Sequence, residues 1–82
     1  VYKRQGEHEY VLSARLEIEK VNETFGLDLP ESDDYLTVGG LILNRYQSFP
    51  KLHEVIEVDK YQFKIIKVTA TKIELVRLKV IE

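Results

Sequence analysis

The residues best suited to bind a ligand lie in one acidic segment, residues 22–41 (NETFGLDLPESDDYLTVGGL). Glu31, Asp33 and Asp34 place three carboxylates in one short loop, and hard cations prefer carboxylate ligands. Their spacing is not that of an EF-hand loop, and Ca²⁺ sites usually add backbone carbonyls and further carboxylates. A solvated acidic loop is the favoured interpretation. A weakly bound Mg²⁺ or Ca²⁺, helped by a neighbouring chain, is the alternative, and no other cofactor is predicted.

The pair Gly39-Gly40 at the end of this segment raises a second chemical question. The pair begins a predicted helix, where free backbone N–H groups favour an anion such as phosphate. However, no strand immediately precedes it, and neither a GxGxxG nor a GxxxxGK[ST] pattern is present. We therefore expect the two glycines to let the second helix approach the first helix or the sheet closely.

Catalytic chemistry is not predicted. His8 and His53 are the only histidines, and neither has the spacing of a metal ligand. His53 beside Glu54 could form a general base with a neighbouring carboxylate. No nucleophile or oxyanion element accompanies them, and no serine stands in a nucleophile-elbow or triad context. The prediction is that this chain has no catalytic residues and is not an enzyme.

The elements that must position these residues begin with a strand and a helix. EYVLSA (9–14) has the alternation of a short strand. In residues 16–26 apolar side chains recur at helical spacing, and Gly26 stands where a helix ends with positive φ. Pro30 prevents the helix from restarting. Asn22, followed by Glu23, flanks the apolar stripe, so we expect its amide to hydrogen-bond the backbone of the following loop.

A second helix and several strands complete the predicted fold. Thr37 is the predicted N-cap of a helix over residues 38–49, which Pro50 closes. After a turn at residues 51–54, an extended region begins at Val58. The alternation of apolar and polar residues shifts by one position at residues 65–66 and again within residues 73–80. Such shifts predict a β-bulge in a bent hairpin that closes at residues 69–72.

The predicted fold class is α+β, a two-layer sandwich in the order β-α-α-β-β-β. Two helices cover one face of a small, mainly antiparallel sheet. Residues 1–8 are expected to be a polar lead-in, and residues 9–82 a single domain. The absence of cysteine excludes disulfides as a source of stability.

Charge and hydropathy argue against nucleic-acid binding and against a membrane-spanning segment within this sequence. The net charge of −2 and the pI of about 5.7 argue against nucleic acid as a partner. Residues 1–50 carry a net charge of −4 and residues 51–82 one of +2, a split that suits docking to another domain. No apolar run is long enough to span a bilayer, and no signal peptide is visible. The missing initiator Met suggests a fragment of a longer protein.

The order of these motifs resembles the CorC/HlyC transporter-associated domain. The resemblance rests on VNETFGLDLP (21–30), TVGGLI (37–42), Pro50, and the closing strands YQFKI (61–65) and IELVRLKV (73–80). It covers about residues 9–81. The structural motif that it assigns comprises Asn22, Glu23, Gly26, Pro30, Thr37, Gly39, Gly40 and Pro50. The chain departs from the family pattern at Ser13-Ala14, where a glycine is frequent, and at His53-Glu54, where Gly-Glu is frequent.

The resemblance implies a C-terminal domain of haemolysin-like or magnesium/cobalt efflux membrane proteins. Its expected partners are a pair of CBS domains and the transmembrane region of the same protein, with a homodimer as a further expectation. It implies a location at the cytoplasmic face of the bacterial inner membrane and a regulatory role in divalent-cation transport. The family fold is related to some FAD-binding domains, but no glycine pattern in this chain supports FAD.

Two function hypotheses follow. The first is a non-catalytic regulatory or interaction domain of a CBS-containing transporter, which acts through contacts that differ between the transporter's states. The alternative is a sensor that binds a divalent cation or small ligand through the acidic loop 31–34.

Overall fold

The structure, a computed structural model, describes residues 2–6 and 8–81, and their side chains from residue 8 onward. Five antiparallel strands form one sheet in the order β1-β2-β5-β4-β3. The strands are β1 (Tyr2–Gly6), β2 (Glu9–Ser13), β3 (Val55–Val58), β4 (Tyr61–Val68) and β5 (Ile73–Val80). Two helices, α1 (Ile18–Phe25) and α2 (Val38–Tyr46), connect β2 to β3.

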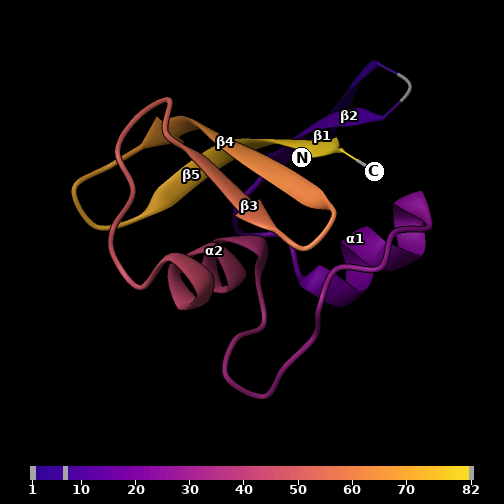
Figure 1. The fold of residues 1–82 in the computed structure, drawn as a ribbon, viewed down its shortest axis with the longest axis horizontal. Coiled ribbons are helices and arrows are strands. Elements are labelled where there is room, and N and C mark those ends of the chain that lie inside the picture. Colours follow the sequence, from indigo (N-terminus) through magenta and orange to yellow (C-terminus); the bar gives the residue numbers. More distant parts are fainter. Residues whose placement is uncertain (1, 7, 82) are drawn as a thin grey trace.

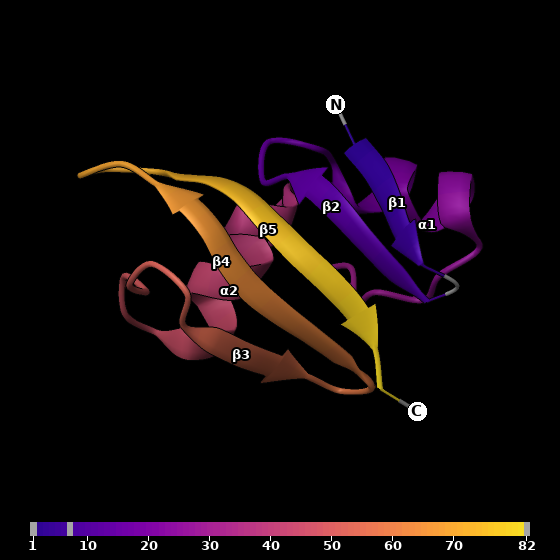
Figure 2. The ribbon, with the colours of Figure 1, turned by 90° about the horizontal axis from the view of Figure 1, so that it is seen from above.

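Both helices lie on the same side of the sheet, and the other side is left uncovered (Figures 1 and 2). Burial alternates along the strands accordingly, because successive side chains point to opposite faces. The predicted α+β sandwich is therefore confirmed, and over residues 9–81 the order of elements is β-α-α-β-β-β, as predicted.

An additional strand precedes the predicted elements. Residues 2–6, expected to belong to a polar lead-in, form β1 and pair with β2 at the edge of the sheet. The sequence YKRQG shows no apolar alternation, which is why its pairing escaped prediction. A strand at a sheet edge can pair through its backbone alone, and charged residues are common there because they discourage aggregation.

The first helix ends as its sequence predicts. Gly26 adopts φ 66° and ψ 34°, the left-handed conformation, and its backbone N–H donates to the carbonyl of Asn22. The ring of Phe25 packs against Tyr10 of β2 with centroids 4.3 Å apart, which holds the end of α1 on the sheet. Leu29 then returns to the core and is 1% exposed.

The second helix is shorter than predicted. The side chain of Thr37 caps its first turn, but the helix ends at Tyr46 and not at Pro50. Gln47 takes a left-handed conformation with φ 58°, and its N–H donates to the carbonyl of Leu43. The apolar spacing that continues to Phe49 misled the prediction, because Phe49 lies beyond the helix and is 40% exposed. Pro50 is buried, within the connection to β3.

The last two strands form the predicted bent hairpin. The register shifts at residues 65–68, opposite residues 73–76, so a bulge displaces the parity of both strands. The hairpin closes at residues 69–72, where the N–H of Thr69 donates to the carbonyl of Lys72 at 2.8 Å. The extended region begins earlier than predicted, since β3 starts at Val55 and only a short turn at residues 59–60 separates it from β4.

Candidate functional site

The side chain of Asn22 hydrogen-bonds the loop that follows α1. Its Nδ2 donates to the carbonyl of Leu29 at 3.0 Å, and its Oδ1 accepts from the N–H of Leu29 at 2.8 Å. The side-chain amide therefore satisfies both backbone groups of one buried residue, as two paired strands would. This agrees with the expected contact between the Asn22 amide and the loop backbone. Glu23, its neighbour, is exposed.

Two tyrosine hydroxyls fasten the same loop at further points. The hydroxyl of Tyr61, a residue that is 1% exposed in β4, accepts from the N–H of Asp28 at 2.7 Å. The hydroxyl of Tyr35 donates to the carbonyl of Pro30 at 2.7 Å. Residues 28–30 are thus held by side chains of α1, of β4 and of the loop itself.

The start of α2 has no backbone donors to spare for an anion. The N–H of Val38 donates to the carbonyl of Leu16 and that of Gly39 to the carbonyl of Ala14, both at 2.9 Å. The N–H of Gly40 donates to Oγ1 of Thr37 at 3.1 Å. A phosphate at this helix terminus would have to displace three internal hydrogen bonds, so the geometry disfavours a phosphate site.

The two glycines have packing roles instead. A Cβ on Gly39 would stand 3.2 Å from the carbonyl oxygen of Ala14 and 3.3 Å from its Cβ. A Cβ on Gly40 would stand 3.0 Å from the Cβ of Tyr35. The close approach predicted from the sequence is therefore made to the turn after β2 and to the loop before α2, and not to α1.

The acidic loop carries charge without a preassembled site. Glu31, Asp33 and Asp34 are all exposed. Oε2 of Glu31 accepts from Nδ2 of Asn22 at 3.3 Å, and the N–H of Asp34 donates to Oγ of Ser32 at 3.1 Å. Within the described residues, no group of three or more His, Cys, Asp or Glu side chains is arranged to hold a metal ion. Any cation bound here would have to draw the three carboxylates together.

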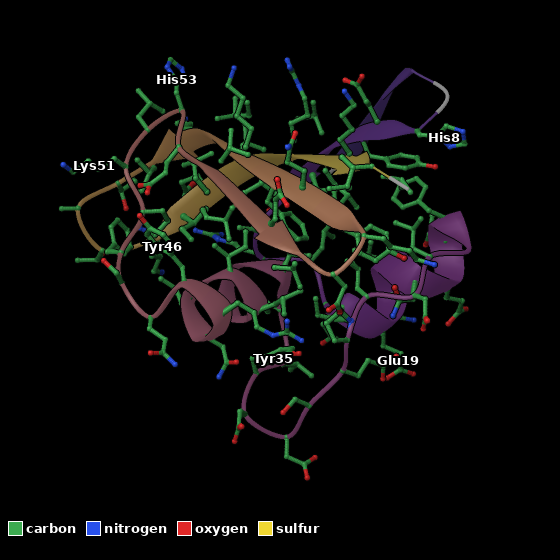
Figure 3. The ribbon with its side chains drawn as sticks, viewed as in Figure 1. His8, Glu19, Tyr35, Tyr46, Lys51 and His53 are labelled. Carbon is green, nitrogen blue, oxygen red and sulfur yellow. The ribbon has the colours of Figure 1, made fainter. Side chains whose placement is uncertain are left out.

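The two histidines lie at opposite ends of the sheet (Figure 3). His53 is exposed on a backbone with φ 69°. The carboxylate of Glu54 is occupied by structural contacts, since Oε1 accepts from the N–H of Lys51 at 2.8 Å and Oε2 accepts from the hydroxyl of Tyr46. Glu54 thus stabilises the turn that leads into β3.

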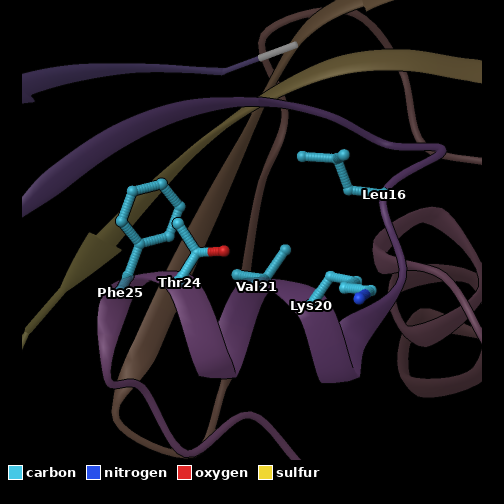
Figure 4. Close-up of a pocket in the computed structure, with 5 residues that line it drawn as sticks. All are labelled: Leu16, Lys20, Val21, Thr24 and Phe25. Carbon is cyan, nitrogen blue, oxygen red and sulfur yellow. The ribbon is translucent and has the colours of Figure 1, made fainter.

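The hollows of the described part of the chain are small or shallow. The crevice in Figure 4 lies between α1 and the segment before it, and its volume is about 40 Å³. It is lined by Leu16, Lys20, Val21, Thr24 and Phe25. Sites for drug-sized ligands usually measure roughly 300–1,000 Å³, so this crevice admits little more than water. Larger hollows, such as the one between the start of α2 and the β4–β5 turn, are open surface depressions.

Sequence reasoning did not single out the uncovered face of the sheet, which we call the open face. It presents Glu9, Val11, Val55, Glu57, Gln62, Lys64, Ile66, Leu75, Arg77 and Lys79. Lys64 of β4 and Arg77 of β5 stand directly opposite each other at its centre. The alternation of FKI (63–65) and VRL (76–78) indicates that Lys64 and Arg77 both point away from the core, but their pairing depends on the register of two strands.

Comparison of the sequence with known proteins assigns the chain to a family. The family model CorC_HlyC, described as a transporter associated domain, matches residues 3–82. The chain belongs to this family. The match begins within β1, so the family pattern includes the strand that sequence reasoning left out.

Curated relatives of the chain are much longer. The magnesium and cobalt efflux protein CorC of Escherichia coli (strain K12) is 29% identical over 79 residues, which are 96% of this chain and 27% of that protein. The protein of the same name from Salmonella typhimurium is 27% identical over the same lengths. The chain therefore spans about a quarter of the relatives that it matches.

Solved structures share the fold. The transporter associated domain CorC_HlyC from Nitrosomonas europaea is 27% identical with a TM-score of 0.84, over 98% of this chain and 95% of that one. A CorC-associated region from Neisseria meningitidis MC58 has a TM-score of 0.86 at 20% identity, over 96% of both chains. The domain of a Xylella fastidiosa hemolysin, solved in complex with Mg²⁺ and Mn²⁺, has a TM-score of 0.82 at 16% identity, over 99% and 98%. Among the described residues, no helix is sufficiently long and apolar to span a bilayer.

Proposed function

We propose that this chain is a non-catalytic regulatory and interaction domain of a CorC-like ion transporter. The observation that carries the proposal is the family match across residues 3–82, together with relatives named magnesium and cobalt efflux proteins. In this proposal residues 9–82 are the core of a domain within a longer membrane protein. A CBS pair and a transmembrane region belong to the same polypeptide, and the domain lies at the cytoplasmic face of the inner membrane.

The proposed mechanism is a shift of population between transporter states. A domain changes such an equilibrium only as far as its contacts differ between the two states. The hydrogen bonds that hold Asp28 and Leu29, and those that occupy the backbone donors at the start of α2, support a domain that contacts its neighbours through its surface. The proposal therefore assigns no chemical step to this chain.

Deletion from the full-length transporter tests the proposal. Residues 1–82 are replaced by a flexible linker, and Mg²⁺ and Co²⁺ efflux is measured in cells and in vesicles. Altered flux at equal membrane abundance is expected. The matched control carries Glu23→Ala, an exposed change that keeps the domain intact. Normal flux and normal assembly after deletion would refute the regulatory role.

Cation sensing through the acidic loop is the second candidate. It is favoured by three exposed carboxylates between residues 31 and 34, and by the Xylella domain solved with Mg²⁺ and Mn²⁺. Calorimetric titration of the chain with Mg²⁺, Mn²⁺, Co²⁺ and Ca²⁺ tests it, with Asp33→Asn/Asp34→Asn as the variant and Glu23→Gln as the control. Binding that the double variant loses and the control keeps would support it. No heat at millimolar metal, or equal heat in both variants, would exclude the loop.

A homodimer is the remaining proposed partner state. The two edges of the sheet, β1 and β3, present backbone groups that can pair with another strand. Sedimentation of the chain across a concentration series measures this association directly, and a constant monomer mass up to millimolar concentration would exclude it.

A further inference from the structure

The open face brings two positive charges together, and neither of them forms an ion pair within the described residues. Lys64 and Arg77 are directly opposite in register on adjacent central strands, and both are half-buried. Like charges placed directly opposite on a sheet are destabilising. Within residues 2–6 and 8–81, neither side chain forms an ion pair. The pair is thus an energetic cost that the fold itself does not require.

Arg77 adds a second, independent sign of a missing partner. Its Nε is buried and has no hydrogen-bond partner in the part of the chain that the structure describes. A buried donor without a partner is unfavourable, whereas a carboxylate accepts well from a guanidinium, often through two parallel hydrogen bonds. One incoming carboxylate would satisfy this donor and separate the two positive charges.

Cross-strand partners on the open face form rows that run across the sheet. The row of Lys64 and Arg77 also contains valines, and the neighbouring row contains residues of both charges. Val11 stands opposite Arg77 on one side, and Val55 stands opposite Lys64 on the other. Val55 is 47% exposed at the edge of the sheet. Val11 and Val55 thus stand on either side of the basic pair, and Lys3 of β1 pairs with Val11 beyond it. A basic centre between two apolar residues would fit a segment that carries a carboxylate among apolar side chains.

The neighbouring row sets a limit on the partner. Glu9 and Glu57 lie at its two ends, with Lys79 and Gln62 between them. The basic centre is therefore flanked by carboxylates on the same face. A single acidic residue would contact only the centre and avoid these carboxylates, whereas a continuous anionic surface such as a phospholipid bilayer would also be brought against them. The charge pattern favours an acidic peptide segment over a membrane surface.

We propose that the open face docks an acidic, amphipathic segment of the same polypeptide from outside residues 1–82, with one carboxylate between Lys64 and Arg77. This inference rests on the proposed function, in which the chain is one domain of a longer CorC-like protein. The matched relatives contain further sequence in which such a segment could lie, since this chain covers only 27% of their length. The inference adds to that function a specific surface and the chemistry of its partner.

Zero-length cross-linking in the full-length protein tests the docking. A carbodiimide couples an amine to a carboxylate without a spacer, so the two groups must come into direct contact. The expected product joins Lys64 to an Asp or Glu outside residues 1–82, identified by mass spectrometry. Lys20, an exposed lysine on α1, is the internal control for non-specific coupling. Lys64→Arg is the matched variant, because it keeps the charge and removes the reactive amine.

A second measurement follows the role of Arg77. The acetylation rate of the Lys64 amine is compared between the full-length protein and the isolated chain, and protection in the full-length protein is expected. Arg77→Gln should weaken that protection about tenfold, the effect of one lost charge-assisted hydrogen bond. Circular dichroism and hydrogen exchange of β5 establish that the variant is folded.

Three results would overturn the docking inference. They are coupling of Lys64 no higher than that of Lys20, coupling only between two copies in an isotopically mixed sample, and protection that requires anionic vesicles of phosphatidylglycerol. Its failure is distinct from failure of the proposed function. Altered efflux after deletion with an unprotected Lys64 would refute the docking alone, and a cross-linked Lys64 with unaltered efflux would refute the regulation alone.

Discussion

Replacement of Asn22, a half-buried residue of α1, by alanine should destabilise the domain. The variant removes two hydrogen bonds to the backbone of Leu29, at 3.0 and 2.8 Å. Leu29 is 1% exposed, so its N–H and carbonyl would be left with poor access to water. A buried polar group without a partner costs about 1–3 kcal/mol. The loss should therefore reach about 2–4 kcal/mol, reduced by roughly 0.5 kcal/mol because alanine favours the helix.

This loss is large for a domain of this size. Stabilities of roughly 0.05–0.15 kcal/mol per residue correspond to about 4–12 kcal/mol for the whole chain. With a urea m-value of about 1–2 kcal/mol/M, the net loss should lower the midpoint by on the order of 1–3 M without a change in slope. Urea unfolding followed by circular dichroism and tyrosine fluorescence measures the shift.

The matched control is Glu23→Ala, at the next position of the same helix. Glu23 is exposed, so the free energy of unfolding should change by no more than about 0.5 kcal/mol. A loss below about 1 kcal/mol for Asn22→Ala would refute the reasoning, because it would mean that water replaces the amide at Leu29. An equal loss in both variants would attribute the effect to the helix and not to the hydrogen bonds between Asn22 and Leu29.

Three further substitutions test the elements around this loop by the same unfolding assay. Gly26→Ala should lower the free energy of unfolding by about 1 kcal/mol through the φ of 66° alone, since a Cβ there meets nothing within 4 Å. Gly26→Asn should cost less, because asparagine tolerates this conformation better. Equal losses in the two variants would contradict this cause. Thr37→Ala should cost about 1 kcal/mol by removing the acceptor for Gly40, and Thr37→Ser should restore it. Tyr61→Phe should cost about 1 kcal/mol by leaving the N–H of Asp28 without its acceptor at 2.7 Å, and an unchanged midpoint would show that this bond contributes nothing.

Local sequence was sufficient where a feature depends on neighbouring residues. The end of α1 at Gly26 and the cap at Thr37 follow from backbone preferences that act within one helical turn. The bulge near Ile65 was visible as a shift in apolar parity, because burial of one sheet face imposes a period of two. These predictions succeeded because the physical cause and the pattern occupy the same few residues.

Predictions failed where apolar spacing and local backbone geometry disagreed. The apolar repeat of the second helix continues to Phe49, the predicted end. The left-handed conformation at Gln47 instead ends the helix at Tyr46, three residues earlier. The strand β1 carries no apolar alternation and is held by the backbone of β2. In both places the deciding contact is a hydrogen bond that leaves no trace in hydropathy.

The amino-acid sequence by itself determined the α+β class, the stop and restart around residues 26–37, and the family. All three follow from the order of residue types along the chain. It could not determine that the donors of Val38 and Gly39 are already occupied, because their acceptors are Leu16 and Ala14, more than twenty residues away. Nor could it determine that Lys64 faces Arg77, since that pairing follows from the register of two strands. The tertiary structure thus occupies the donors at the glycine-rich helix start and leaves Nε of Arg77, on the open face, without a partner among the described residues, because long-range hydrogen bonds and strand register decide which polar groups have partners.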